Sequence, residues 1–307
     1  MKAILTHQHG GPETLELAEI QAPEAGPDSV LVRVKAAGVN PVDRHIVAGH
    51  LNSLVPVNLP LVPGFDVAGV VDAVGEGVTQ YAVGDEVFGY VRTDVVQHGT
   101  YAQFVAAPLF TLARKPAALN WQEAAGLPLV GLTALQAWAR VGLKTGETVL
   151  VHAAAGGVGS AAVQVAVAKG ARVIGTASER NHDFLRSLGA EPVTYGDGLA
   201  DRVRRLAPES IDAALDCVGG DAVAVSQELL KDSSRVVSIV DPEVVQRGGH
   251  HVFTQPDPAD LAELSALADA GKLTVHVEQT FPLAEVADAF RLSETARVRG
   301  KIVLEVG

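Results

Sequence analysis

Cysteine is almost absent from this sequence of 307 residues, which contains only Cys217. A single cysteine cannot form a disulfide within the chain, and it cannot supply the thiolates of a structural zinc site. Basic residues are also few, because 24 Lys and Arg stand against 36 Asp and Glu, a formal net charge of -12. An acidic surface repels phosphate backbones, so we expect no nucleic-acid partner, although a local basic pocket can still bind a small anion.

Segments that direct a chain to or across a membrane are lacking as well. The first ten residues, MKAILTHQHG, become polar too early for a signal peptide. The longest run of small apolar residues, 151–168, contains three glycines, a histidine, a serine and a glutamine. This composition fits a strand followed by a helix better than a membrane span. We therefore expect a cytoplasmic protein with no membrane partner.

The residues that are present divide the chain into three segments. Residues 1–119 contain short strands separated by glycine and proline, a pattern typical of a barrel-like β domain. Residues 120–255 begin with a helical stretch, interrupted near Pro128, and continue with strands that alternate with helices. The expected strands are 148–151, 172–176, 213–217 and 235–240. This alternation predicts an α/β domain with a parallel, doubly wound sheet, and residues 256–307 are expected to rejoin the first domain.

A glycine-rich turn follows the first of these strands and leads into a helix from about Val158. It reads Ala154-x-Gly156-x-x-Gly159, a pattern typical of dinucleotide binding when it lies between a strand and a helix. Glycines permit a tight turn and the close approach of a pyrophosphate, which binds to N–H groups at the positive end of the helix. The residues expected to hold it are Ala155, Gly156, Gly157, Val158 and Gly159. The alternative is a tight turn that binds nothing.

The second strand ends without the acidic residue that dinucleotide-binding chains often carry there. It reads Thr176-Ala177-Ser178, followed by Glu179 and Arg180. A carboxylate would bind the ribose hydroxyls and repel a 2′-phosphate, whereas Ser178 and Arg180 offer a hydroxyl and a cation. Charge-assisted hydrogen bonds contribute about 1.5–3 kcal/mol each, so we expect NADPH to bind in preference to NADH if Glu179 points to solvent. Tyr195 either flanks the same phosphate or is an ordinary turn tyrosine.

Several longer motifs occur in one order along the whole chain. They are AAGVNPVDRHIVAG, PGFDVAGVV, VGDEVFGY, GTYAQF, LPLVGLTALQAW, VLVHAAAGGVGSAAVQVA, LDCVGG and GKIVLEV. Together they resemble the medium-chain dehydrogenase/reductase superfamily, and within it the zinc-free quinone oxidoreductase branch that includes zeta-crystallin. The resemblance implies a GroES-like catalytic domain, formed by residues 1–119 and 256–307, and a Rossmann domain at 120–255. It also implies a homodimer, joined through the edge strand near His251–Gln255.

The positions of the family's zinc ligands carry other residues here. In zinc-dependent relatives the first motif contains a metal-binding cysteine and the second a histidine, and this chain has Asn40 and Phe65 in those places. The four-cysteine structural zinc lobe is missing, and no HxxxH pair offers a substitute. We therefore expect no metal.

The resemblance assigns further roles. Asn40 and Thr133 are expected at the nicotinamide. The motifs LDCVGG and SIVDPEVV are expected to run beside the cofactor and to contact it at Val218 and Ile239. Asp43 is either a catalytic group or a structural anchor of its loop. His45 stands where such reductases often carry a tyrosine. Either His45 or His50 protonates the product, or both are surface histidines and solvent supplies the proton.

Without a metal to polarise a simple ketone, activated acceptors remain. We expect an NADPH-dependent oxidoreductase that transfers hydride to a quinone or an α,β-unsaturated carbonyl and stabilises the product by hydrogen bonds. Two alternatives stay open. One is a reductase of 2-enoyl thioesters or alkenals on the same scaffold, and the other is an NADPH-binding structural or sensor protein with marginal activity.

The replacement of the zinc ligands predicts that a chelator does not affect turnover. Dialysis of the purified protein against EDTA should leave its rate of NADPH oxidation unchanged, because neither Asn40 nor Phe65 is a ligand that zinc requires. The rate before and after dialysis, with and without added zinc, checks this. Loss of activity that zinc restores would contradict it.

Overall fold

The computed structural model describes residues 1–307, which form two compact units. Unit 1 comprises Met1–Leu129 and Gln255–Gly307, and unit 2 comprises Val130–Thr254. The first division falls after Leu129 rather than after residue 119, because α2 (Trp121–Gly126) packs on the sheet of unit 1. A Cβ atom at Gly38 of that sheet would lie only 2.4 Å from the Ala125 carbonyl oxygen. Glycine at this position therefore lets the helix approach the strand closely.

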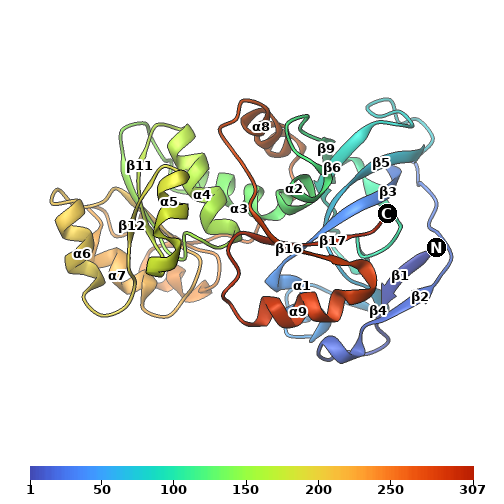
Figure 1. The fold of residues 1–307 in the computed structure, drawn as a ribbon, viewed down its shortest axis with the longest axis horizontal. Coiled ribbons are helices and arrows are strands. Elements are labelled where there is room, and N and C mark those ends of the chain that lie inside the picture. The colour runs from blue at the N-terminus through green and yellow to red at the C-terminus, as the bar shows by residue number, and fades with distance from the viewer. The chain divides into compact units, whose positions relative to one another are not determined.

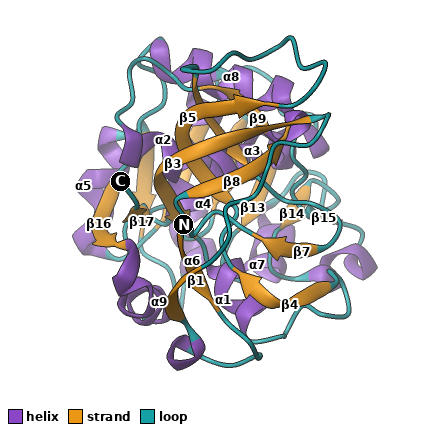
Figure 2. Ribbon diagram, turned by 90° about the vertical axis from the view of Figure 1, so that its right-hand side faces the viewer, coloured by secondary structure: helices purple, strands orange, loops and turns teal.

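Unit 1 is built on a seven-stranded sheet in the order β16-β17-β3-β5-β6-β9 (Figure 1), with β8 paired to β3 (Figure 2). Its strands are β3 (Ser29–Val39), β5 (Asp66–Val74), β6 (Glu86–Tyr90), β8 (Phe104–Pro108), β9 (Leu112–Arg114), β16 (Val277–Pro282) and β17 (Lys301–Glu305). Strand β17 pairs antiparallel with β3, with Ile302 opposite Val39. The end of the chain thus lies against its first third.

Two small sheets and three further helices complete unit 1. The sheets pair β1 (Lys2–Leu5) with β2 (Glu16–Glu19), and β4 (Val57–Val62) with β7 (Val96–His98). The helices are α1 (Pro41–Val47), α8 (Pro258–Asp269) and α9 (Val286–Glu294). Short 3-10 turns are η1 (Pro12–Thr14), η2 (Leu109–Thr111) and η5 (Leu283–Glu285).

Unit 2 contains the expected parallel sheet, in the order β12-β11-β10-β13-β14-β15. Figure 1 labels β11 and β12 of this sheet, and Figure 2 labels β13, β14 and β15. Its strands are β10 (Thr148–Val151), β11 (Arg172–Thr176), β12 (Ala190–Val193), β13 (Ala213–Asp216), β14 (Val236–Ser238) and β15 (His250–His251). Helix α3 (Pro128–Arg140) precedes it, followed by α4 (Gly157–Ala168), α5 (His182–Ser187), α6 (Leu199–Leu206) and α7 (Ala222–Leu229). The 3-10 turns are η3 (Glu179–Asn181) and η4 (Pro242–Arg247). The α/β class and the doubly wound sheet are confirmed.

Two details of unit 2 differ from the expectation. Strand β12, AEPV, was not predicted, because proline and glutamate are both depleted in strands. The expected edge strand at His251–Gln255 is wrong beyond its first residue, since β15 ends at His251. Its partner β14 ends at Ser238, whose Oγ donates to Asp216 Oδ2 at 2.7 Å. With no partner strand beyond Ser238, the residues after Val252 have no ladder to join.

Buried apolar side chains fill both units. In unit 2 they include Leu150, Ile174 and Ala214 on neighbouring strands, packed against the helices. None of the helices is both long and apolar enough to span a membrane.

Candidate functional site

The glycine turn of unit 2 joins β10 to α4 and leaves backbone donors available. Gly156 is the N-cap of α4, with φ -77° and ψ 179°, and no side chain caps the helix there. The first N–H groups of a helix have no intrahelical acceptor. The Gly156 N–H donates to the Ala153 carbonyl oxygen at 3.0 Å. Gly157 and Val158 are partly exposed, so an anion can reach their N–H groups at the positive end of a twelve-residue helix.

The shape of this turn depends on Gly159 and on β11. A Cβ atom at Gly159 would lie 2.3 Å from the Ala153 carbonyl oxygen, so only glycine lets the helix come this close. Thr176 at the end of β11 accepts from Ala153 N at its Oγ1 (3.0 Å) and from Ala154 N at its carbonyl oxygen (2.9 Å). Ala153 is thereby held at φ 51°. The residues present fit the pyrophosphate of a dinucleotide.

The turn also lies where the sheet reverses its order. Strand β10 is flanked by β11, followed by β12, on one side and by β13, followed by β14, on the other. Nucleotides bind to open α/β sheets at the carboxyl ends of the strands, at this switch point.

The expected 2′-phosphate site lies beyond β11. Ala177 is buried, Ser178 is half-buried and is the N-cap residue of η3, and Glu179 and Arg180 are exposed. Tyr195 is 59% exposed. Its loop is held by the Arg202 guanidinium, which donates to the carbonyl oxygens of Thr194, Tyr195, Gly196 and Asp197.

Asp216 organises the loops after β13 and β14. Its Oδ1 accepts from Val218 N and Gly219 N at 2.8 Å each, and its carbonyl oxygen accepts from Ile239 N at 3.1 Å. Val218 is 62% exposed. Burial, and secondarily Asp216, raises the pKa of the Cys217 thiol between them, which disfavours the reactive thiolate.

Thr133 on α3 is buried rather than open. Its Oγ1 lies 2.7 Å from Thr254 Oγ1, and its side chain is 3% exposed. Its expected place at the nicotinamide stays a prediction.

In unit 1, Asn40 and Asp43 shape the start of α1. Asn40 is the N-cap, and its backbone N–H donates to Asp43 Oδ2 at 2.7 Å. The same carboxyl oxygen accepts from Tyr101 Oη at 2.6 Å. Each of the three residues is at most 1% exposed. Asp43 thus anchors this loop, whereas its Oδ1 atom is buried and has no hydrogen-bond partner.

The buried charged residues Asp66 and Lys301 lie beside Asn40. We call the group of Asn40, Asp43, Asp66, Tyr101 and Lys301 the buried polar cluster. Asn40 Nδ2 donates to Asp66 Oδ2 at 2.9 Å, and Lys301 Nζ donates to Asn40 Oδ1 and, at 3.0 Å, to the Val39 carbonyl oxygen. Lys301 Nζ also lies 3.9 Å from Asp66 Oδ2. Asp66 Oδ1 accepts from Leu129 N at 2.9 Å, in the first turn of α3.

Burial dominates the protonation equilibria of this cluster. It raises the pKa of Asp43 to about 7, although the hydrogen bond from Tyr101 opposes the rise. Burial also raises the pKa of Asp66 to about 6, against the attraction of the Lys301 ammonium. Burial lowers the pKa of Lys301 and, with Asp43, raises that of Tyr101.

His45 lies at the other end of α1 and is exposed. Its Nδ1 is 3.4 Å from His50 Nδ1. Partial burial first, then Arg44 and His50, lower the pKa of His45. These effects favour neutral imidazole near pH 7, so the structure adds no support for His45 as the proton donor.

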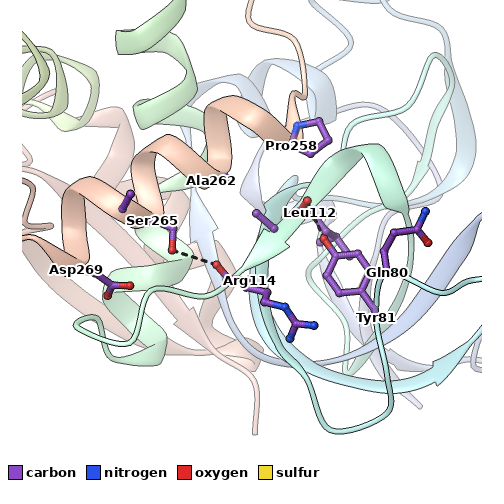
Figure 3. Close-up of a pocket in the computed structure, with 10 residues that line it drawn as sticks. Gln80, Tyr81, Leu112, Arg114, Pro258, Ala262, Ser265 and Asp269 are labelled. Carbon is purple, nitrogen blue, oxygen red and sulfur yellow. Dashed lines mark hydrogen bonds between the residues drawn. The ribbon is translucent and has the colours of Figure 1, made fainter.

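One further hollow, of about 470 Å³, lies in unit 1 between β9 and α8 (Figure 3). Tyr81 and Arg114 face it, and Ser265 Oγ donates to the Arg114 carbonyl oxygen at 3.2 Å. None of the residues expected to be functional lines this hollow.

Comparison with known proteins decides the family. Residues 26–117 match the alcohol dehydrogenase GroES-like domain, and residues 188–304 match the zinc-binding dehydrogenase family. A chloroplastic NADPH-dependent alkenal/one oxidoreductase of Arabidopsis thaliana is 35% identical over 99% of this chain and 79% of its own. The chain belongs to the medium-chain dehydrogenase/reductase superfamily. The expected resemblance is confirmed.

Solved structures of the superfamily agree. The quinone oxidoreductase of Coxiella burnetii is 36% identical with a TM-score of 0.88, over 100% of this chain and 99% of its own. A mycobacterial member complexed with NADPH is 30% identical with a TM-score of 0.84, over 100% of both chains. The GroES-like and Rossmann assignments are thus confirmed.

Phe65 and Asn40, which stand where zinc-dependent superfamily members carry zinc ligands, form packing and hydrogen-bond contacts within unit 1. Phe65 is 3% exposed and packs edge-on against Tyr90, with ring centroids 5.7 Å apart. Asn40 accepts from Lys301 at Oδ1 and donates to Asp66 from Nδ2.

Sequence reasoning gave no functional role to Asp66, Tyr101 or Lys301. The available signal was a lysine at the head of the apolar strand KIVLE, since a lysine is almost never fully buried unless it is paired.

The raised pKa of Asp43 predicts a specific pH dependence of stability. Below about pH 4 the carboxyl is protonated in both folded and unfolded chains. As pH rises toward 7 only the unfolded chain ionises, so the folded chain loses up to about 1.4 kcal/mol per pH unit from this group. Asp43→Asn keeps the acceptor oxygen and cannot ionise, so its urea midpoint should fall less between pH 5 and 8 than that of the wild type.

Asp72→Asn is the matched control, because Asp72 forms an exposed ion pair with Arg33. Its pH profile should parallel that of the wild type. Parallel profiles for Asp43→Asn as well would contradict a proton held at Asp43.

Proposed function

We propose that the protein is an NADPH-dependent oxidoreductase that reduces quinones and α,β-unsaturated carbonyl compounds. The observation that carries the proposal is the first turn of α4, which follows Gly156 and has no side-chain cap. Gly159 in this turn packs against the Ala153 carbonyl oxygen. Relatives that are named as alkenal/one and quinone oxidoreductases support the choice of acceptor.

In this proposal the residues of unit 2 hold the cofactor. Backbone N–H groups of Ala155, Gly157, Val158 and Gly159 bind the pyrophosphate around Gly156, whose own N–H donates to the Ala153 carbonyl oxygen. Ser178 and Arg180 bind the 2′-phosphate, with Tyr195 beside it. Val218 and Ile239 line its path. When bound, the cofactor supplies a hydride from C4 of its nicotinamide ring. NADPH is preferred to NADH because no carboxylate at the end of β11 opposes the 2′-phosphate, and Glu179 is exposed.

Asn40 and Thr133 are proposed to orient the nicotinamide. Their hydrogen-bonding groups also stabilise charge that develops on the acceptor oxygen. Asp43 acts by fixing the loop of Asn40, since its Oδ2 holds the Asn40 backbone N–H. The proton of the product comes from His45 or from solvent.

We further propose that two copies pair along the β15 edge. That edge has no partner strand within the chain, and Val240, Val245 and Phe253 near it are 49%, 57% and 42% exposed. Exposed apolar edges favour pairing with another chain.

A screen of acceptors tests the proposed function. Purified protein should oxidise NADPH with 1,4-quinones or with enones, and more slowly with enoyl thioesters. Faster turnover on a thioester would instead assign an enoyl thioester reductase. Tight NADPH binding by calorimetry without turnover on any acceptor would replace the proposal with a cofactor-binding protein.

Arg180→Ala tests the cofactor preference. Loss of one charge-assisted hydrogen bond should raise the KM for NADPH roughly tenfold or more and leave the KM for NADH nearly unchanged. Arg186→Ala is the control, because Arg186 on α5 is exposed and pairs with Asp183. Equal effects of Arg180→Ala on both cofactors would remove this explanation of the missing acid.

A further inference from the structure

The carboxamide of Asn40 is held by two groups of opposite charge. Its Oδ1 accepts from the Lys301 ammonium, and its Nδ2 donates to Asp66 Oδ2 at 2.9 Å. An amide has an acceptor on one side and donors on the other. A cation on one side and a carboxylate on the other therefore permit only one orientation of the side chain.

Lys301 is itself fixed from several directions. Its backbone N–H donates to the His276 carbonyl oxygen at 2.9 Å, and its ammonium donates to the Val39 carbonyl oxygen at 3.0 Å. A Cβ atom at Gly126 would lie 3.4 Å from Lys301 Cγ, so α2 packs closely on the lysine stem. The side chain is 4% exposed.

We propose that Lys301 is a positioning residue, whose ammonium group sets the orientation of the Asn40 carboxamide. The lysine does this directly, as the donor to Oδ1, and indirectly, because its charge keeps Asp66 ionised and hence an acceptor for Nδ2. Its effect on turnover rests on the proposed function, in which Asn40 orients the nicotinamide; its effect on the amide does not.

Removal of the Lys301 ammonium group should reverse the orientation of the Asn40 carboxamide, so that Oδ1 and Nδ2 exchange places. In Lys301→Met, Asn40 Oδ1 loses its donor, and Asp66 loses the cation that opposes the effect of burial on its pKa. A protonated Asp66 then offers an O–H donor to Oδ1. When pH rises enough to ionise Asp66, the carboxylate again accepts from Nδ2, and the original orientation returns.

The double variant Lys301→Met/Asp66→Asn should hold the reversed amide at every pH. Position 66 keeps one side-chain oxygen, which the Leu129 N–H occupies in the first turn of α3. Its NH₂ group then faces Asn40 and donates to Oδ1. Because the buried charges are removed together, the urea midpoint should recover relative to Lys301→Met.

The experiment measures kcat, KM for NADPH and urea midpoint from pH 6 to 9 for the wild type, both variants and the control Lys272→Met, an exposed lysine of unit 1. We expect kcat of Lys301→Met to fall about 10- to 100-fold at pH 7, and to recover at alkaline pH, with little change in KM. The double variant should be stable yet slow at every pH, and Lys272→Met should match the wild type.

The Asn40 side-chain NH₂ signals in ¹⁵N-labelled protein, assigned from their loss in Asn40→Asp, give a readout that needs no turnover. They should differ between pH 7 and 9 in Lys301→Met and stay constant in the double variant. If the wild type turns over no acceptor, the proposed function fails and this arm still tests the orientation. Unchanged NH₂ signals in Lys301→Met, or recovery of kcat together with stability in the double variant, would overturn the inference.

Discussion

One buried ammonium group, set against two buried carboxyl groups, is the constraint on which unit 1 depends. Transfer of a charge into the interior costs several kcal/mol unless a partner and further hydrogen bonds compensate it. Asp66 obtains this compensation from Lys301, Asn40 Nδ2 and Leu129 N. These groups belong to the last strand of the chain, the loop after β3 and the first turn of α3. The polar cluster therefore joins three segments that are distant from one another in the sequence.

Helix α4 of unit 2 differs from two helices of similar length because no side chain accepts from the N–H groups of its first turn. The three longest helices are α3, α4 and α8. The first turn of α3 receives the Asp66 carboxylate, and that of α8 receives Asp257, which accepts from Ala259 N and Asp260 N. Helix α4 begins with Gly156 and has no side-chain cap. Its first N–H groups have no side-chain acceptor, and they are the donors that the proposed function assigns to the pyrophosphate.

The sequence predicts best where a pattern is local. The strands of unit 2 follow from short apolar runs, and its glycine turn follows from a motif of six residues, 154–159. Strand β12 escapes because Glu191 and Pro192 interrupt its apolar pattern, although parallel pairing with β11 tolerates both. The pair of Asp66 and Lys301 escapes for a different reason. Each residue stands alone in its own segment, and only the antiparallel pairing of β17 with β3 brings Lys301 beside Val39 and Asn40.

The protonation of the polar cluster explains how a single lysine suffices for two carboxyl groups. Asp66, close to the ammonium, is the more acidic of the two, with a pKa of about 6 against about 7 for Asp43. Asp43 receives both of its hydrogen bonds on Oδ2, and its buried Oδ1 receives none. A bare anionic oxygen in the interior costs more than a neutral hydroxyl. Near neutral pH the cluster therefore contains the Lys301 ammonium, the Asp66 carboxylate and a partly protonated Asp43. Lys301 and Asp66 form the charged pair around Asn40, and Asp43 acts mainly as a hydrogen-bond acceptor.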